Sequence, residues 1–200
     1  MKDEEKLINS AKSGDEKAFG ELYEKYLTPI YRYVFMRVGY RKHEAEDIAH
    51  QVFMSAWQNM RTYETQGFPF SSWLYRIAHN AVIDYYRTQR PSFDLELVND
   101  NIAFADIPEL ENRIDDRMQM EGVRVALAKL EPDQQNVIIM KFVNELENKE
   151  IAQALGKTEG AVRVIQHRAL KQLKTLLSAE GGSASSGQQN EGDNNTIKEV

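Results

Sequence analysis

Residues 63–90 read YETQGFPFSSWLYRIAHNAVIDYYRTQR, a run that combines seven aromatic side chains with three arginines. Its second part is predicted to form a helix, because apolar and basic residues recur there at intervals of three or four. One face would carry an apolar stripe, Trp73, Ile77, Ala81 and Tyr85, and the opposite face a basic, amide-bearing stripe, Arg76, Asn80, Arg87 and Arg90. Such a combination suits single-stranded nucleic acid, where rings stack on unpaired bases and cations meet phosphates. A core helix with solvated arginines is the alternative, and this segment alone favours neither.

Helical periodicity extends over nearly all of the sequence before this run. Apolar residues follow helical spacing in 15–38 and in 44–60, and no stretch alternates as a strand does. Pro29 is expected to bend the first of these helices or to break it. A loop is expected just before the helix of the aromatic run. The start of this helix is expected to be capped by Ser71 or Ser72.

The chain divides into four parts by composition. Residues 1–91 form the first predicted domain, which is all-α. Residues 92–113 hold six acids against one base and are predicted to be an acidic linker. Residues 114–177 form a second helical domain, and residues 178–200 are a polar tail too poor in apolar side chains to fold.

The second domain has the pattern of a helix-turn-helix. A short helix and a longer one are predicted on either side of Gly156, which stands where a left-handed residue ends a helix, and Thr158 is expected to cap the longer helix. The outward face of the longer helix is basic and holds Arg163, His167, Arg168 and Lys171. Such side chains reach guanine edges and phosphates in a major groove. The alternative is a helix whose cations only complement its own dipole, but helix, turn and spacing together favour DNA binding.

Composition argues against several classes of protein. The net charge is −6, no cysteine is present, and four histidines are scattered without ligand spacing, so neither disulfides nor a metal site is expected. No phosphate-binding glycine loop, serine nucleophile motif or zinc-protease motif occurs, which predicts a protein that is not an enzyme and needs no cofactor. No apolar run reaches the length of a membrane span, and the start MKDEEKLINS does not resemble a targeting signal. We therefore expect a cytoplasmic protein without membrane insertion.

Three segments, in this order, resemble bacterial sigma factors of the extracytoplasmic-function (ECF) type. They are EAEDIAHQVFMSAWQNM at 44–60, FPFSSWLYRIAHNAVIDYYR at 68–87, and LEPDQQNVIIMKFVNELENKEIAQALGKTEGAVRVIQHRALKQL at 130–173. These look like the family's core-binding helix of region 2, its DNA-melting and promoter-reading segment of region 2, and its helix-turn-helix of region 4. Gln135 departs from the pattern, because the family commonly has an arginine there. The resemblance implies two small helical domains and a transcription initiation factor that binds core RNA polymerase, recognises two promoter elements and promotes strand opening.

The resemblance also assigns roles to single residues. Those implied to bind core polymerase are Asp47, Gln51 and Met54. Those implied to contact the minus-ten promoter element are Phe68, Phe70, Arg76, Asn80, Arg87 and Arg90, with the loop from Tyr63 to Phe70 holding a base flipped from the stack. Those implied to contact the minus-thirty-five element are Thr158, Arg163, His167, Arg168 and Lys171. Trp73 and Tyr85 are expected in the core rather than at DNA, because they fall on the apolar stripe.

The partners that the resemblance implies are the beta-prime clamp and beta flap of core polymerase, duplex and melted promoter DNA, and an anti-sigma factor. Two other interpretations stay open. A stand-alone helix-turn-helix regulator would explain the second domain but would leave the aromatic run without a role. A sigma-mimicking decoy would only titrate an anti-sigma factor, and the basic residues of the last helix argue against it.

Overall fold

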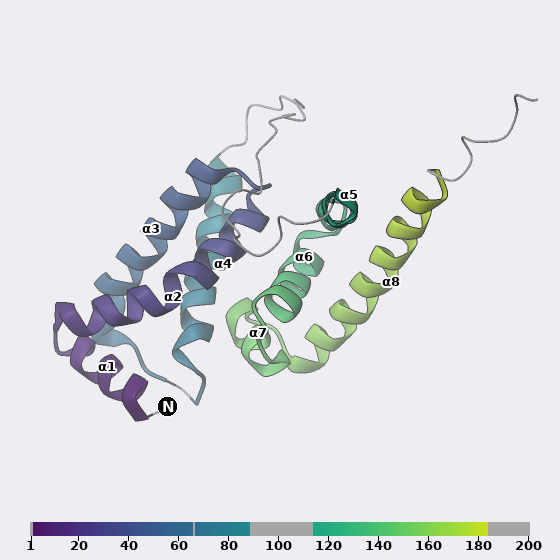
Figure 1. The fold of residues 1–200 in the computed structure, drawn as a ribbon. Helices are drawn as coiled ribbons and strands as arrows, with labels where there is room; N and C mark the ends of the chain where they lie inside the picture. Colours follow the sequence, from purple (N-terminus) through teal and green to yellow (C-terminus); the bar gives the residue numbers. More distant parts are fainter. Residues whose placement is uncertain (1, 66, 89–113, 184–200) are drawn as a thin grey trace, which may run out of the picture.

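The computed structural model describes residues 2–65, 67–88 and 114–183, which form helices with short connections (Figure 1). The N-terminal domain comprises α1 (Lys2–Lys12), α2 (Glu16–Arg37), α3 (Lys42–Asn59), the 3₁₀ turn η1 (Met60–Thr62) and α4 (Phe70–Thr88). The C-terminal domain comprises α5 (Ile114–Ala128), α6 (Pro132–Ile138), the π-helical turn η2 (Ile139–Val143), α7 (Asn148–Leu155) and α8 (Glu159–Ser183). No strand occurs among the described residues, and the predicted all-α fold of two helical domains is confirmed. Arg90, the predicted linker and residues 184–200 of the predicted tail lie outside the described residues.

Helix α2 begins at a side-chain cap and continues through a proline. The Asp15 carboxylate accepts hydrogen bonds from the backbone N–H of Lys17 at 3.0 Å and of Ala18 at 3.3 Å, which satisfies donors that a first turn leaves unpaired. Pro29 lies inside the helix, so of the two expected alternatives, a bend or a break, the break does not occur. A proline costs a helix interior ~3 kcal/mol, whereas each fully buried large side chain contributes ~1.5–3 kcal/mol. Four such side chains flank the proline and hold the helix together: Leu22, Ile30, Tyr33 and Val34.

Helix α4 packs against α2 and α3 through a different stripe from the predicted one. Its buried apolar residues are Phe70, Leu74, Tyr75, Ala78 and Val82. The predicted stripe is only partly buried and lies at the side of the buried face. The predicted position of that face along the helix is therefore wrong by one residue. The series Leu74, Ala78 and Val82 has the same spacing one position later, and its smaller side chains let the helices approach more closely.

The start of α4 also differs from the expectation. The helix begins at Phe70, so Ser71 and Ser72 lie within its first turn rather than before it. The Ser72 hydroxyl is buried without a hydrogen-bond partner, so the predicted cap by Ser72 is wrong. Instead, the Ser72 backbone N–H donates to the Pro69 carbonyl at 3.1 Å and closes the first turn.

Helices α7 and α8 form the predicted helix-turn-helix. Gly156 ends α7 at φ 63° in the left-handed region, which a residue without Cβ adopts at no steric cost. The Thr158 hydroxyl accepts a hydrogen bond of 3.2 Å from the Ala161 N–H and so caps α8, as predicted. The two helices share a buried core that includes Ile151, Ala152, Val162 and Ala169. Helix α8 extends to Ser183, past the predicted end of the domain at 177.

The two domains pack against each other, with α7 against α4 and η2 against α2 (Figure 1). The Tyr33 hydroxyl of α2 donates to Asn136 Oδ1 of α6 at 2.9 Å, and the Arg37 guanidinium donates to Gln135 Oε1. After the π-helical turn, the Asn144 amide donates to the Pro29 carbonyl at 3.0 Å. The domain contact therefore includes polar pairs as well as apolar packing.

Candidate nucleic-acid interface

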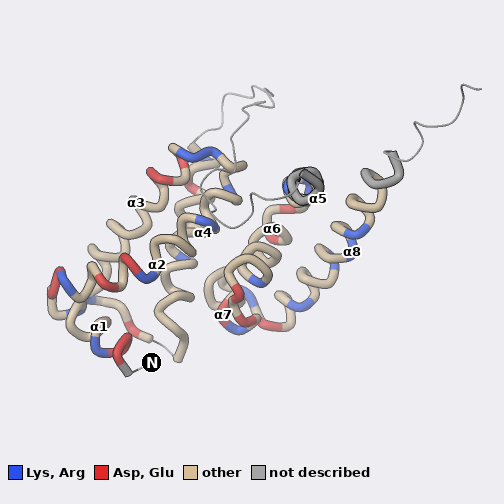
Figure 2. The backbone as a smooth tube through the Cα atoms, in the orientation of Figure 1, with Lys and Arg blue, Asp and Glu red and all other residues tan. Residues whose placement is uncertain are grey.

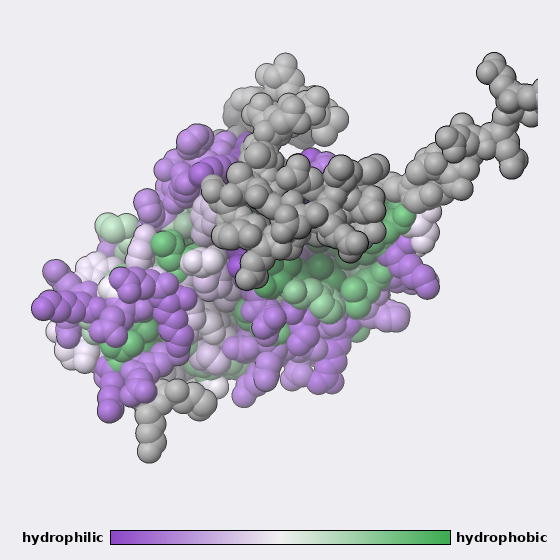
Figure 3. Space-filling view, in the orientation of Figure 1, coloured by the Kyte–Doolittle hydropathy of each residue, from purple (hydrophilic) through white to green (hydrophobic). Residues whose placement is uncertain are grey.

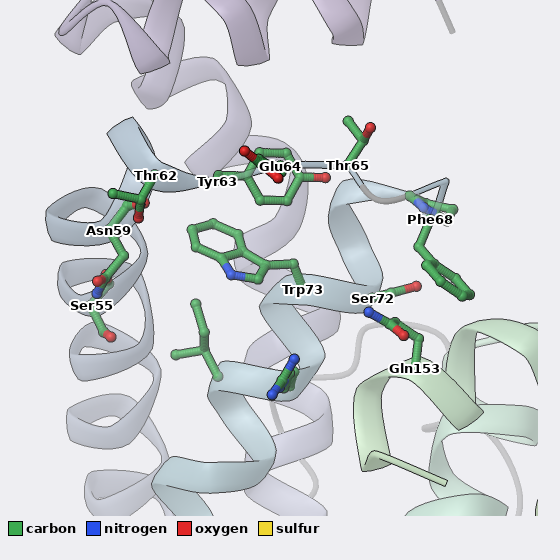
Figure 4. A pocket seen from close by; sticks show the side chains of 13 residues that line it. Ser55, Asn59, Thr62, Tyr63, Glu64, Thr65, Phe68, Ser72, Trp73 and Gln153 are labelled. Atoms are coloured by element: carbon green, nitrogen blue, oxygen red, sulfur yellow. The ribbon is translucent and has the colours of Figure 1, made fainter. Parts of the chain in front are cut away.

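A pocket of about 290 Å³ opens at the start of α4 (Figure 4). It is lined by the end of α3 with η1, by the loop that follows, by the first two turns of α4, and by Gln153 of α7. A water molecule occupies ~30 Å³ of liquid, so the pocket has room for a ring-sized ligand. It lies in the loop-and-helix run from which single-strand binding was expected.

One wall of the pocket is aromatic. The ring centroids of Tyr63 and Trp73 are 4.7 Å apart, and the Phe70 ring lies 5.4 Å from Trp73 and 5.3 Å from Tyr63. Phe70 also contacts Tyr26 and is only 2% exposed, so it is a core residue that supports the wall. The implied contact of Phe70 with DNA is therefore not available in this structure. Trp73 was expected in the core; it is half-buried, packs against the core and also lines the pocket.

Two buried hydroxyl groups line the same pocket without a hydrogen-bond partner. They belong to Tyr63 and to Ser72, which is fully buried. Burial raises the pKa of Tyr63 to about 12, with a smaller contribution from the Glu4 carboxylate, so its phenol is neutral at physiological pH. Buried polar groups are nearly always paired in folded proteins. Both hydroxyls lie beneath the surface, so the part of the wall that a flat ring can reach is the half-buried Trp73.

The basic stripe of α4 begins at this pocket. Phe68 and Arg76 both line the pocket, so two of the implied minus-ten residues meet there. Asn80 is exposed one turn after Arg76, and Arg87 is exposed farther along the helix. Arg87 forms an ion pair of 3.1 Å with Asp84, and exposed pairs of this kind are weak enough to exchange for a phosphate. The structure thus places two arginines, Arg76 and Arg87, on the helix that carries the aromatic pocket.

Helix α3 presents a separate stripe on its outer face. Asp47, Gln51 and Met54 are all exposed, at positions three or four residues apart, while Ile48 and Val52 between them are buried. Met54 is 59% exposed. An exposed thioether between polar groups is typical of a protein interface.

The basic face of α8 is exposed along its first half. Arg163, His167, Arg168 and Lys171 all reach solvent, and Figure 2 shows basic residues recurring along this helix. Arg163 forms an exposed ion pair with Glu159 one turn earlier. The Thr158 hydroxyl caps the first turn of the same helix. The residues implied to read the second promoter element therefore lie on one element and are accessible.

The C-terminal domain also exposes large apolar side chains. Those on its helices are Val123, Val164, Leu170 and Leu177, and Phe142 is 52% exposed on η2. Figure 3 shows apolar surface in green along α8 in this view. Exposed apolar side chains of this size are available for contact with a partner.

Across residues 2–65, 67–88 and 114–183, no helix is both long and apolar enough to cross a membrane. The same residues contain no group of histidine and carboxylate side chains arranged to hold a metal ion.

Two models of sigma-70 domains match the chain. Sigma-70 region 2 matches residues 22–91, and sigma-70 region 4 matches residues 120–173. The first match contains the outer stripe of α3 and every lining residue of the pocket except Gln153, and the second contains Gln153 and the helix-turn-helix.

Curated relatives of the chain are ECF RNA polymerase sigma factors. BldN of Streptomyces coelicolor is 34% identical over 173 residues, which are 86% of this chain and 64% of BldN. SigW of Bacillus subtilis is 30% identical over 182 residues, which are 86% of this chain and 95% of SigW. SigD of Mycobacterium tuberculosis is 31% identical over 188 residues, which are 89% of this chain and 85% of SigD.

Solved structures share the fold at lower identity. CnrH in complex with the cytosolic domain of CnrY superposes with a TM-score of 0.68 at 24% identity, over 89% of this chain and 99% of CnrH. The sigma factor RpoE in complex with the anti-sigma factor NepR from Bartonella quintana gives 0.63 at 21% identity, over 82% of this chain and 99% of RpoE. These likenesses concern the arrangement of helices.

Proposed function

The chain belongs to the family of ECF RNA polymerase sigma factors, and on this premise we propose that it directs core RNA polymerase to promoters as an alternative sigma factor. It recognises a minus-thirty-five and a minus-ten element and promotes strand opening, while polymerase makes the RNA. Sigma factors act as initiation factors without an active site of their own, and the proposed place of action is the cytoplasm, where core polymerase works.

The aromatic pocket is the observation that carries this proposal. A base flipped from the minus-ten element would stack on Trp73, the half-buried member of the aromatic wall. Flipping costs a few kcal/mol, and stacking on an aromatic side chain returns ~1–3 kcal/mol per base. The phosphates of the opened strand would follow Arg76, Asn80 and Arg87, which are exposed along α4.

The second promoter element would be read by α8. Its exposed Arg163, His167, Arg168 and Lys171 would face the major groove, with Thr158 at the start of the helix near a phosphate. Exposure of these side chains supports the proposal, and the Glu159–Arg163 ion pair is weak enough to break on binding.

Core polymerase would be bound through two faces. The α3 stripe of Asp47, Gln51 and Met54 would meet the beta-prime clamp, because it combines a carboxylate, an amide and an exposed thioether. The exposed apolar residues of the C-terminal domain would meet the beta flap. An anti-sigma factor is a further proposed partner, since both structural neighbours were solved in complex with another protein and one of these is an anti-sigma factor.

Run-off transcription tests the proposal directly. Core polymerase, this protein and a pool of promoter fragments are combined, and defined starts are expected only when both proteins are present. Gel shifts of duplex DNA by the protein alone, without any starts, would support a stand-alone regulator instead. Neither starts nor shifts, together with tight binding of an anti-sigma factor, would support the decoy.

A further inference from the structure

We propose that Ile83 selects a thymine in the minus-ten element by packing against its methyl group, in the middle of the face of α4 that meets the phosphates of the same strand. This inference rests on the function proposed for α4. It adds a residue that selects a base through an apolar contact. Thymine is the base concerned, because it alone carries a methyl group on the edge that faces the major groove.

Ile83 lies at the centre of the outward face of α4. It is 48% exposed, whereas the preceding Val82 is buried. Arg76 and Asn80 are exposed seven and three positions before Ile83, and Arg87 is exposed four positions after it. This spacing puts the four side chains on one face of the helix. An apolar side chain therefore stands between two arginines and an amide.

A second exposed apolar side chain lies next to Ile83. Tyr86 follows three positions later, at the spacing of neighbours on a helix surface, and is 40% exposed. Its hydroxyl donates to the Arg37 carbonyl at 2.7 Å, and its ring centroid lies 5.2 Å from that of Tyr85. The Tyr86 ring is therefore held in place. Single exposed apolar residues need no explanation, whereas these two form a patch.

The flanking arginines indicate what covers this patch. A protein partner with an apolar face would have to bury the Arg76 and Arg87 guanidinium groups beside it, which costs free energy unless each is paired. A DNA strand brings phosphates to the guanidinium groups and base edges to the residue between them. DNA is therefore the partner that complements both the charges and the apolar patch.

The position of Ile83 along the helix places the contact within the minus-ten element. Ile83 stands seven residues after Arg76, which lines the pocket. A helix rises ~1.5 Å per residue, so the two positions are ~10 Å apart along its axis. Successive nucleotides of one strand are ~3.4 Å apart. The selected thymine therefore lies about three nucleotides from the base in the pocket.

The contact disfavours the other bases. Adenine and guanine present the acceptor N7 at the major-groove edge, and an apolar side chain over this atom removes water without supplying a donor. Cytosine has no methyl group and gains less apolar contact. Burial of one methyl group corresponds to about fourfold in affinity.

The first test identifies the base position that depends on Ile83. The full-length protein and core polymerase transcribe a promoter that gives run-off starts, with its minus-ten segment randomised, and the templates that yield products are sequenced. The unmodified protein is expected to enrich thymine at one position. Ile83→Ala, which is exposed and keeps a helix-forming residue, is expected to lose this preference and to retain those at other positions.

Two further variants serve as controls for this selection. Ile83→Val keeps a branched apolar side chain and should retain most of the preference. Thr88→Ala, an exposed change at the end of the same helix, should retain all of it. The proposal is overturned if the unmodified protein enriches no thymine, or if Ile83→Ala shows the same preferences. An equal loss of starts on every template would also overturn it, because Ile83 would then act without regard to the base.

The second test removes the methyl group from the DNA alone. Thymine at the selected position is replaced by deoxyuridine, and the affinity of core polymerase with this protein for the promoter is measured by competition. The unmodified protein should lose about fourfold in affinity, whereas Ile83→Ala should bind both promoters equally. An equal loss in the two proteins would refute the contact. Absence of starts from every promoter would refute the sigma function and this contact with it, whereas starts that do not respond to Ile83→Ala refute only the contact.

Discussion

The Tyr33 hydroxyl donates a hydrogen bond of 2.9 Å to Asn136 Oδ1, joining residues 103 positions apart in the sequence within a buried contact. Burial raises the pKa of Tyr33 above its ordinary value, so the phenol remains a donor at physiological pH. Asn136 stands next to the buried Val137 and Ile138. A buried amide among apolar neighbours is explained by this partner in the other domain.

Replacing Tyr33 by phenylalanine removes the donor and leaves the Asn136 oxygen buried without a partner. We expect the free energy of unfolding to fall by ~1–3 kcal/mol, measured by urea titration. The double variant Tyr33→Phe with Asn136→Leu removes both polar groups and should recover part of that loss. An unfolding curve of Tyr33→Phe that matches the unmodified protein would mean that the pair contributes no stability in solution.

Trp73→Ala removes the aromatic face of the pocket. Loss of one stacked base costs ~1–3 kcal/mol, so strand opening should fall by roughly 5- to 150-fold, measured by permanganate reactivity of unpaired thymines at a promoter. Binding of duplex DNA by α8 should not change. Trp73→Phe keeps a ring and should retain most of the opening. If Trp73→Ala and Trp73→Phe both open promoters as well as the unmodified protein, Trp73 does not stack on a base.

Lys171→Ala removes one cation from the exposed face of α8. If Lys171 meets a phosphate, binding of duplex promoter DNA weakens for every sequence, and the slope of log K against log salt falls by about one. Lys17→Ala removes the same charge from an exposed position of α2 and serves as the control. Equal salt slopes for the two variants would place Lys171 outside the DNA contact.

Asp47→Ala removes the carboxylate of the α3 stripe. We expect the affinity for core polymerase to fall by about tenfold, equivalent to ~1.4 kcal/mol, measured by fluorescence anisotropy of the labelled protein. Glu21→Ala changes the same charge at an exposed position of α2 and should bind normally. Binding of DNA without polymerase should be the same in both variants. A normal affinity of Asp47→Ala for core would exclude Asp47 from the docking face.

His79 predicts a pH dependence of stability. Burial lowers the pKa of His79, and Arg37 lowers it further; Asp133 opposes this, and Lys157 adds the smallest lowering. The unfolded chain therefore takes up the proton at a higher pH than the folded chain, and stability is lost as the pH falls below about 6.5. In urea titrations between pH 7.5 and 5.5, the free energy of unfolding of His79→Gln should fall less steeply than that of the unmodified protein. Parallel curves would show that the lowered pKa of His79 does not contribute to the pH dependence of stability.

Local features of the fold were predictable from the sequence because their causes are local. The left-handed Gly156 and the capping Thr158 depend on the backbone within one turn, and both lie where they were expected. The phase of α4 was predicted wrongly, because Trp73, Ile77, Ala81 and Tyr85 share the spacing of the buried series and are larger and more aromatic. Choosing between two such faces requires knowledge of what α2 and α3 offer opposite them.

The candidate site was predicted only in part for a related reason. Phe68 and Arg76 line the pocket as the resemblance implies, whereas Phe70 points into the core because Tyr26 and Tyr63 surround it. The contribution of Gln153 depends on a contact between domains, for which a single sequence holds no periodic signal. The burial of Asn136 likewise depends on the other domain, because four of the seven residues of α6 are polar and the sequence does not mark which of them is buried.

The order of synthesis separates the two contributions to the pocket lining in time. All of its lining residues up to Ile77 emerge from the ribosome early, but Gln153 follows 76 positions later. At ~5–20 residues per second, this delay lasts roughly 4 to 15 s. The nascent N-terminal domain therefore holds its whole share of the pocket lining for seconds before the last contributor, Gln153, is synthesised.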